Sequence, residues 1–150
     1  MRVYLDTGVY NRPFDDQTQP RIWLESLALS IILQMIESGD LELITSTVVA
    51  YETGRNPFAQ RREWVERVGQ LALHHQLVDD TIRLRALSLE QEGLKALDAL
   101  HVACAEAAGA DYFITVDDRL IRRYHALSNQ GVIAVDPASF VREVVGQNLR

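Results

Sequence analysis

The chain has 150 residues, of which 47% are hydrophobic and 24% charged, and these proportions are typical of one globular domain. Its single cysteine, Cys104, excludes an internal disulfide and a zinc site built from several cysteines. The net charge of −6, spread over both halves, disfavours simple electrostatic binding to phosphate backbones. No apolar stretch approaches the roughly 20 residues that span a bilayer, and a strand-like run follows Met1 directly, so we expect no signal peptide and a cytoplasmic protein.

The first predicted elements are a strand over 3–5, which ends at Asp6, and a polar loop over 11–19. Hydrophobic residues then recur at helical spacing from Pro20, a favoured first helical residue, to Gly39, a favoured helix end. The apolar face of this helix is so broad that we expect it to be buried on two sides or used in self-association.

Residues 41–45 alternate like a strand, and Ser46 is a good N-cap for a helix that runs to Gly54. The pair Asn56-Pro57 predicts the start of a further amphipathic helix. The later predicted elements are a short strand at 76–78, a helix capped by Asp80, an alanine-rich helix at 97–108, a strand at 112–116, a helix through Tyr124, a strand at 132–135 and a helix at 137–145. This alternation predicts a three-layer α/β/α sandwich with a central parallel sheet of four to five strands, in a single domain over 1–150.

Four acidic residues lie where one edge of this sheet could gather them. Asp6 ends the first strand, and Asp117 directly follows the strand at 112–116. Glu52 lies about two turns into the helix after the second strand, and Asp98 lies in the first turn of the alanine-rich helix. Crowded carboxylates need a positive charge among them, and oxygen ligands suit Mg²⁺ or Mn²⁺. The pattern therefore predicts a metal site able to support phosphodiester hydrolysis.

Each acid taken alone also fits an ordinary structural role, such as a turn, a cap or a solvated helix position. Asp6 and Asp98 are the strongest candidates, Asp98 because it interrupts the apolar neighbours Leu97 and Ala99. His101, one turn later on the same helix face, is expected to be a packed histidine that orients its surroundings rather than a metal ligand. Cys104 fits a small core residue, and His74-His75 fits a helix end.

The chain resembles PIN-domain nucleases over nearly its whole length. The residues that carry the resemblance are Val3-Tyr4-Leu5-Asp6-Thr7, Val49-Ala50-Tyr51-Glu52, Leu97-Asp98-Ala99-Leu100-His101-Val102-Ala103 and Ala110-Asp111-Tyr112-Phe113-Ile114-Thr115-Val116-Asp117. The resemblance implies a parallel sheet in the order 3-2-1-4-5 and a Mg²⁺- or Mn²⁺-dependent endoribonuclease that cleaves RNA.

By the same resemblance, Asp6, Glu52, Asp98 and Asp117 become the catalytic metal ligands, and the hydroxyl of Thr115 would orient the last acid. Many small bacterial members are VapC-like toxins of toxin–antitoxin pairs, inhibited by an antitoxin protein and often homodimeric. The resemblance therefore implies an RNA substrate, an antitoxin partner and a dimer.

The sequence departs from the family pattern at several positions. Gly8 stands where the family often has Ser or Asn, and the loop over 11–19 is longer than usual. Asp118 follows Asp117 directly, which leaves open which of the two is the fourth acid. Four arginines near the expected site fit either phosphate contacts or a solvated surface; they are Arg12, Arg119, Arg122 and Arg123.

Two other functions compete with a nuclease. A non-catalytic module that keeps the fold and binds RNA or a protein partner would explain the acidic surface and the broad apolar helix at 20–38. Phosphoryl transfer through an aspartyl intermediate, as in phosphatases of the haloacid dehalogenase type, would explain an Asp after the first strand. That mechanism needs a second Asp two residues later, where this chain has Gly8.

Overall fold

The computed structural model describes residues 1–148, and within them it contains a five-stranded parallel sheet. The strands are β1 (Arg2–Leu5), β2 (Glu42–Ser46), β3 (His74–Gln76), β4 (Tyr112–Ile114) and β5 (Ile133–Val135). They lie in the order β3-β2-β1-β4-β5, and every neighbouring pair is parallel. The predicted α/β fold and its strand order are confirmed.

β1 occupies the centre of the sheet because its residues are apolar on both sides. Val3, Tyr4 and Leu5 have no exposed surface, as expected for a parallel strand covered on both faces. β1 pairs with β2 on one side and β4 on the other, where Leu5 lies opposite Ile114. The carboxyl ends of β1 and β4 therefore meet at one edge, at the point where the strand order reverses.

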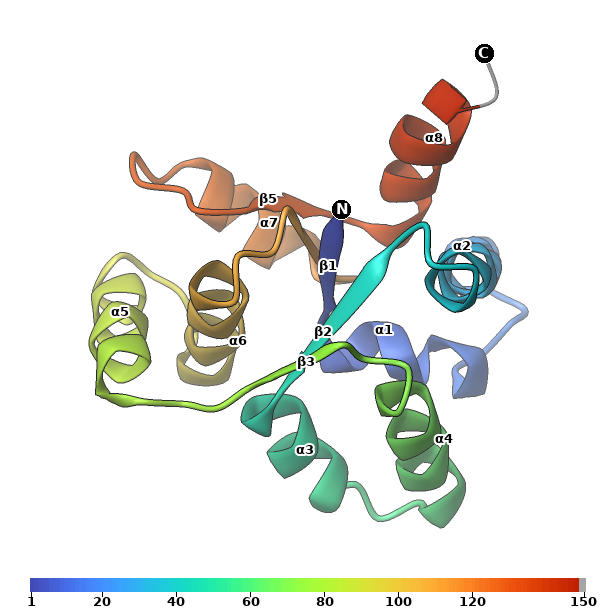
Figure 1. The fold of residues 1–150 in the computed structure, drawn as a ribbon, viewed down its shortest axis with the longest axis horizontal. Helices are drawn as coiled ribbons and strands as arrows, with labels where there is room; N and C mark the ends of the chain where they lie inside the picture. The colour runs from blue at the N-terminus through green and yellow to red at the C-terminus, as the bar shows by residue number, and fades with distance from the viewer. Residues whose placement is uncertain (149–150) are drawn as a thin grey trace.

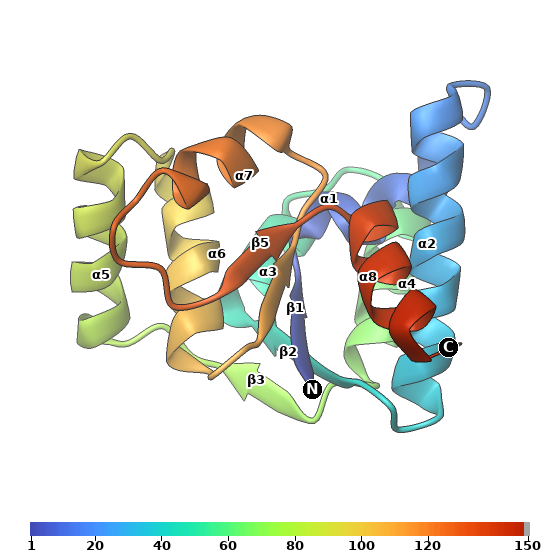
Figure 2. The ribbon, with the colours of Figure 1, turned by 90° about the horizontal axis from the view of Figure 1, so that it is seen from above.

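Eight helices and one 3₁₀ turn cover the sheet within residues 1–148. They are α1 (Thr7–Asn11), η1 (Arg12–Phe14), α2 (Pro20–Glu37), α3 (Thr47–Gly54), α4 (Ala59–Gly69), α5 (Asp80–Gln91), α6 (Ala96–Ala107), α7 (Asp118–His125) and α8 (Pro137–Asn148). Figures 1 and 2 show α5, α6 and α7 on one side of the sheet and α2, α4 and α8 on the other. The buried small residues of α6, Ala99, Ala103 and Ala105, let this helix pack directly on β2, β3 and β4.

The broad apolar face of α2 is only partly buried. Its buried apolar residues are Ala28, Leu29, Ile32 and Ile36, and its exposed ones are Trp23, Leu24, Leu27 and Ile31. The two-sided burial that the sequence suggested is thus incomplete, because α8 packs against one part of the helix and leaves the other part open. Within the described residues, no helix is both long and apolar enough to cross a membrane.

Several predicted boundaries differ from the structure. The loop predicted over 11–19 begins later, at Asp15, because α1 starts directly after Asp6 and η1 follows it to Phe14; residues 15–19 form the loop. Asn56 does not cap a helix; its side chain accepts from the Phe58 amide, and α4 starts at Ala59. Asp79, rather than Asp80, caps α5.

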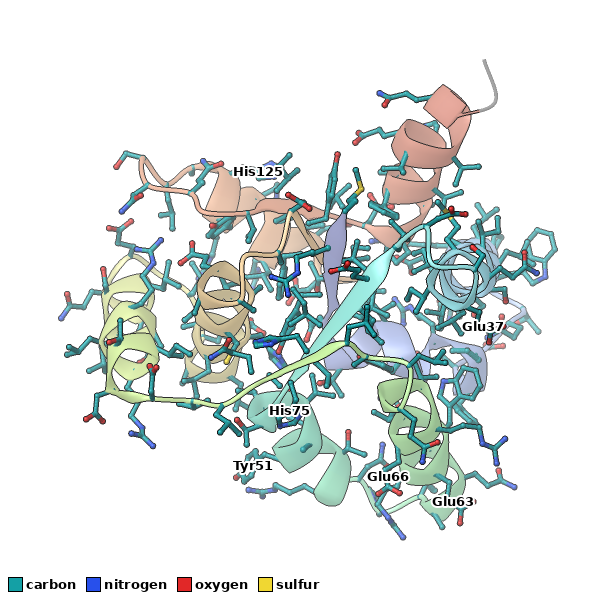
Figure 3. All side chains as sticks on the ribbon, viewed as in Figure 1. Glu37, Tyr51, Glu63, Glu66, His75 and His125 are labelled. Carbon is teal, nitrogen blue, oxygen red and sulfur yellow. The ribbon has the colours of Figure 1, made fainter. Side chains whose placement is uncertain are left out.

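The strand predicted at 76–78 lies two residues earlier, as β3. His74 and His75 therefore belong to an edge strand and not to a helix end. His75 on β3 and His125 at the end of α7 lie at well separated places in Figure 3. The Ser46 cap is confirmed, because its hydroxyl accepts the Val49 amide hydrogen at 3.3 Å.

Candidate metal centre

Asp6 lies at the carboxyl end of β1 with both carboxylate oxygens held. The Thr7 amide donates to Oδ1 at 2.8 Å, which makes Asp6 the N-cap of α1. The hydroxyl of Thr115, just after β4, donates to Oδ2 at 2.8 Å. Two adjacent strand ends therefore fix the orientation of this carboxylate before any ligand binds.

This contact corrects the role predicted for Thr115. Its hydroxyl orients Asp6, whereas its only bond to Asp117 is one accepted from the Asp117 backbone amide at 3.2 Å. The side chain of Thr115 is fully buried. Loss of its hydroxyl would therefore act on Asp6 first.

Glu52 reaches the same place from α3 and is held by two partners. The Thr7 hydroxyl donates to Glu52 Oε1 at 2.9 Å, and the same oxygen makes a short hydrogen bond with His101 Nε2. Burial raises the pKa of Glu52, but the hydrogen bond and charge of His101 outweigh burial and leave this pKa below its ordinary value. Glu52 is therefore held as a carboxylate.

His101 is more central than the sequence suggested. It is 1% exposed, and its Nε2 lies 3.5 Å from Asp6 Oδ1 as well as against Glu52. Burial lowers the pKa of His101, yet the charge of Asp6 and the contacts with Glu52 raise it above the ordinary value. The acids thus favour the imidazolium form.

A buried hydrogen-bond chain supports His101 from the other side. Its Nδ1 lies 2.7 Å from the Tyr4 hydroxyl, which lies 2.6 Å from Ser46 Oγ. Burial raises the pKa of Tyr4 well above its ordinary value, so the phenol keeps its proton. In the imidazolium form His101 can donate to Glu52 and Tyr4, and Tyr4 can donate to Ser46, which satisfies every member.

Asp98 lies beside this group in the first turn of α6. Burial, followed by the charges of Asp6 and Asp117, raises the pKa of Asp98 from its ordinary 3.8 to about 6. The charges of Asp6 and Asp117 add to the effect of burial because like charges disfavour ionisation of a neighbouring acid. Asp98 and Asp117 also line one small cavity together with Lys95.

The two neighbouring acids at the start of α7 face different partners. Asp117 Oδ1 caps the helix by accepting from the Arg119 and Leu120 amides. Asp118 instead forms a bidentate pair with Arg21 of α2, with an Nη2–Oδ1 distance of 2.7 Å. Of these two acids, Asp117 is the one whose charge contributes to the raised pKa of Asp98.

Arg21 was not singled out from the sequence, although it restrains the segment that carries Asp117. It also donates to the Val116 carbonyl at 3.3 Å, and its Nε lies 3.6 Å from the buried Glu25. Arg12 donates to the same Glu25 at 3.0 Å and pairs with Asp15. Arg12, suggested earlier as a phosphate contact, is therefore engaged within the protein.

Steric packing explains why glycine stands at position 8, where the family often has Ser or Asn. A Cβ atom built on Gly8 would lie 3.1 Å from the side chain of Val116, which is tighter than most real contacts. Glycine lets α1 pack against the segment that joins β4 to Asp117. A larger residue here would press on the Val116 side chain, next to Asp117.

The donor groups fit a divalent cation. Asp6, Glu52 and His101 each offer one ligand atom, and these atoms lie within 4.8 Å of one another; His101 can act as a ligand once its imidazolium loses a proton. Two carboxylates and an imidazole suit Mn²⁺, and carboxylates with water suit Mg²⁺. Burial is the first cause of the raised pKa of Asp98, and the negative charges of Asp6 and Asp117, which a cation would offset, add to it.

The fold and the acidic site together define the class of the protein: a parallel α/β domain with carboxylates at the switch point of its sheet. The sequence profile of the PIN domain matches residues 3–126. The chain belongs to the PIN-domain family, as the sequence motifs predicted.

Solved structures from a bacterium and an archaeon are among those that share the fold. VapBC2 from Rickettsia felis, bound to a DNA fragment from its promoter, is 13% identical with a TM-score of 0.58, over 91% of this chain and 98% of that one. PAE2754 from Pyrobaculum aerophilum is 17% identical with a TM-score of 0.57, over 98% of this chain and 91% of that one. No curated protein sequence matches the chain significantly.

Proposed function

We propose that the protein is a Mg²⁺- or Mn²⁺-dependent endoribonuclease that hydrolyses RNA phosphodiester bonds. The observation that carries this proposal is the group of Asp6, Glu52 and His101 within 4.8 Å, next to an Asp98 whose pKa is raised to about 6. Membership of the PIN-domain family supports the same reading. We include β5 and α8, which follow the matched residues, in one domain over 1–150.

In this proposal Asp6, Glu52, Asp98 and Asp117 form the metal site, and His101 is either a ligand or the group that positions Glu52. The cation, once bound, would polarise the scissile phosphate and favour deprotonation of the attacking water. The residues of the chain supply the orientation. Thr115 fixes Asp6, and Thr7 fixes Glu52, so little rearrangement is needed on binding.

The test is cleavage of a labelled RNA in Mn²⁺ or Mg²⁺ by the wild type, Asp6→Asn and Asp98→Asn. We expect activity in the wild type alone and its loss with a chelator. Glu90→Gln, which removes an exposed acid of α5, is the matched control and should cleave like the wild type. Cleavage that survives chelator and both site substitutions would overturn the proposal.

We also propose that the protein is the toxin of a toxin–antitoxin pair and forms a homodimer. The structural likeness to VapBC2 motivates the first idea, and the exposed Trp23, Leu24 and Leu27 of α2 motivate the second. Growth arrest on expression, relieved by a co-expressed small neighbouring protein, would support the first. A monomeric mass at micromolar concentration would contradict the second.

The exposed apolar face of α2 is also the observation that favours a second function, a non-catalytic binding module. The two functions differ in their response to metal. A catalytic site should bind Mn²⁺ and cleave RNA, whereas a module should bind a partner without either. Failure to bind Mn²⁺ at millimolar concentration would favour the module.

A further inference from the structure

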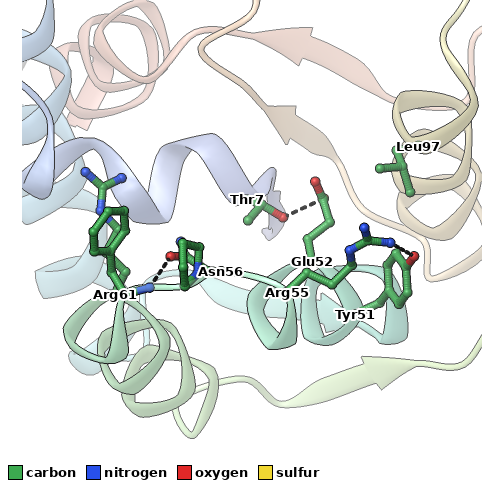
Figure 4. Close-up of a pocket in the computed structure, with 9 residues that line it drawn as sticks. Thr7, Tyr51, Glu52, Arg55, Asn56, Arg61 and Leu97 are labelled. Carbon is green, nitrogen blue, oxygen red and sulfur yellow. Dashed lines mark hydrogen bonds between the residues drawn. The ribbon is translucent and has the colours of Figure 1, made fainter.

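A groove of about 670 Å³ opens directly beside the acidic cluster. Thr7, whose amide donates to Asp6, and Glu52 both line it, and it extends along α3 and the start of α4. Figure 4 shows Glu52 near the middle, with Arg55 and Tyr51 on one side and Arg61 on the other. Anything that occupies the groove therefore lies against Glu52, the acid that lines it.

The groove differs in charge from the chain as a whole. Among its lining residues Glu52 is the single acid, while Arg55 and Arg61 supply two cations. Arg55 is exposed, and among residues 1–148 no carboxylate pairs with it; its guanidinium donates to the Tyr51 hydroxyl at 2.6 Å. In a protein of net charge −6, an arginine without a carboxylate partner is a suitable binding site for an anion.

Exposed aromatic rings line the same groove. Phe58 is 62% exposed and Tyr51 is 53% exposed. Arg61 lies 5.6 Å from the centre of the Phe58 ring and pairs with Asp15, so it holds one wall in place. Rings of this size are costly to leave in water without a partner.

We infer that this groove binds a single-stranded segment of RNA, with a base stacked on Phe58 and a phosphate at Arg55. The inference rests on the proposed nuclease function, because the strand would continue to Glu52. An aromatic face can stack only on a base that is unpaired, and arginine binds the backbone beside it. A duplex keeps its bases stacked and offers these rings no partner.

The test is the affinity of a fluorescein-labelled eight-nucleotide single-stranded RNA, measured by anisotropy in EDTA so that cleavage cannot interfere. We expect Phe58→Ala to weaken binding by about 5- to 100-fold, the usual loss for one stacked base. Phe58→Tyr should retain the affinity. Arg55→Ala should weaken binding and reduce the slope of log K against log salt by about 0.7.

Two substitutions on α5 serve as matched controls, because they change similar side chains away from the groove. Leu84→Ala removes an apolar side chain that is 68% exposed, and Arg83→Ala removes an exposed arginine. Both should bind like the wild type. A hairpin duplex of the same composition should bind much more weakly than the single strand.

The inference is overturned if the groove variants bind as the wild type does, if the duplex binds as well as the strand, or if a peptide binds there and RNA does not. These outcomes are separate from the fate of the nuclease proposal. If the protein never cleaves RNA but Phe58→Ala weakens RNA binding, the groove inference stands and the nuclease proposal fails. If the protein cleaves RNA and neither groove substitution weakens binding, the nuclease proposal stands and the groove inference fails.

Discussion

Replacing Asp98 with asparagine should make the metal-free protein more stable. The pKa of Asp98 lies at about 6 instead of 3.8, because the group is partly buried and faces Asp6 and Asp117. That difference corresponds to about 3 kcal/mol for the ionised form. Screening by solvent at this half-buried position reduces it to about 1 to 2 kcal/mol.

The sign of the effect depends on pH. Asp98 has a folded pKa above its unfolded value, so its ionisation costs stability once the pH exceeds both values. Below pH 3.8 the carboxyl is neutral in either state, and Asp98→Asn should match the wild type. As the pH rises from 3.8 to about 6, the stability of the variant relative to the wild type should increase, and the difference should then stay constant up to neutral pH.

Thermal melts in EDTA at pH 4 and pH 7 measure this directly. At pH 7 we expect Asp98→Asn to melt about 4 °C higher, given about 2–4 °C per kcal/mol for a chain of this length. Manganese at about 100 times its Kd should add about 2.7 kcal/mol to the wild type and much less to the variant. The order of the melting temperatures should therefore reverse with metal.

Glu90→Gln, an exposed acid on α5, is the control and should change neither melt. The assignment of Asp98 to a crowded acidic site is wrong if Asp98→Asn destabilises the protein in EDTA at pH 7. It also fails if Mn²⁺ stabilises the variant and the wild type equally. In either case Asp98 would be an ordinary helix residue and not part of a crowded site.

Three further predictions concern residues that support the fold and the site. Glu106→Gln should lower stability by about 1 to 2 kcal/mol at pH 7, since it weakens a partly buried pair with Arg85. Burial raises the pKa of Glu106, but the hydrogen bonds of Arg85 and Tyr124 and the charge of Arg85 together outweigh burial and lower it. This contribution is therefore present above pH 4.5 and fades below it, as melts at several pH values would reveal. Thr115→Val should keep the fold but lower RNA cleavage about tenfold, because Asp6 loses a hydrogen bond, and Thr115→Ser should restore it in kinetic assays. Arg21→Ala should weaken Mn²⁺ binding in calorimetric titration, because it frees the turn before α7, and unchanged binding would count against that restraint.

The sequence predicted the parts of the fold that depend on local pattern. The apolar run at β1, the Ser46 cap and the small residues of α6 each have one good structural interpretation, and each was confirmed. The neighbouring acids Asp79 and Asp80 could both cap a helix, so the sequence could not fix the register. Tertiary packing decides such cases by one residue.

The candidate site was predicted in outline, since strand ends place Asp6 and Asp117 at one edge. The contacts that organise it join residues far apart in the chain and have no local signature. The pair of Arg21 with Asp118 spans 97 positions, and the contact of Glu52 with His101 spans 49. Nothing near His101 in the sequence indicates that an acid from α3 will lie against it.

The central claim is that the acids at the end of β1 form a divalent-metal site. Anomalous diffraction from crystals soaked in Mn²⁺ tests it most directly. We predict a manganese peak beside the carboxylates of Asp6 and Glu52, absent in Asp6→Asn crystals. If no peak appears at saturating Mn²⁺, or a peak appears only at surface acids elsewhere, the acids at the end of β1 do not form the metal site.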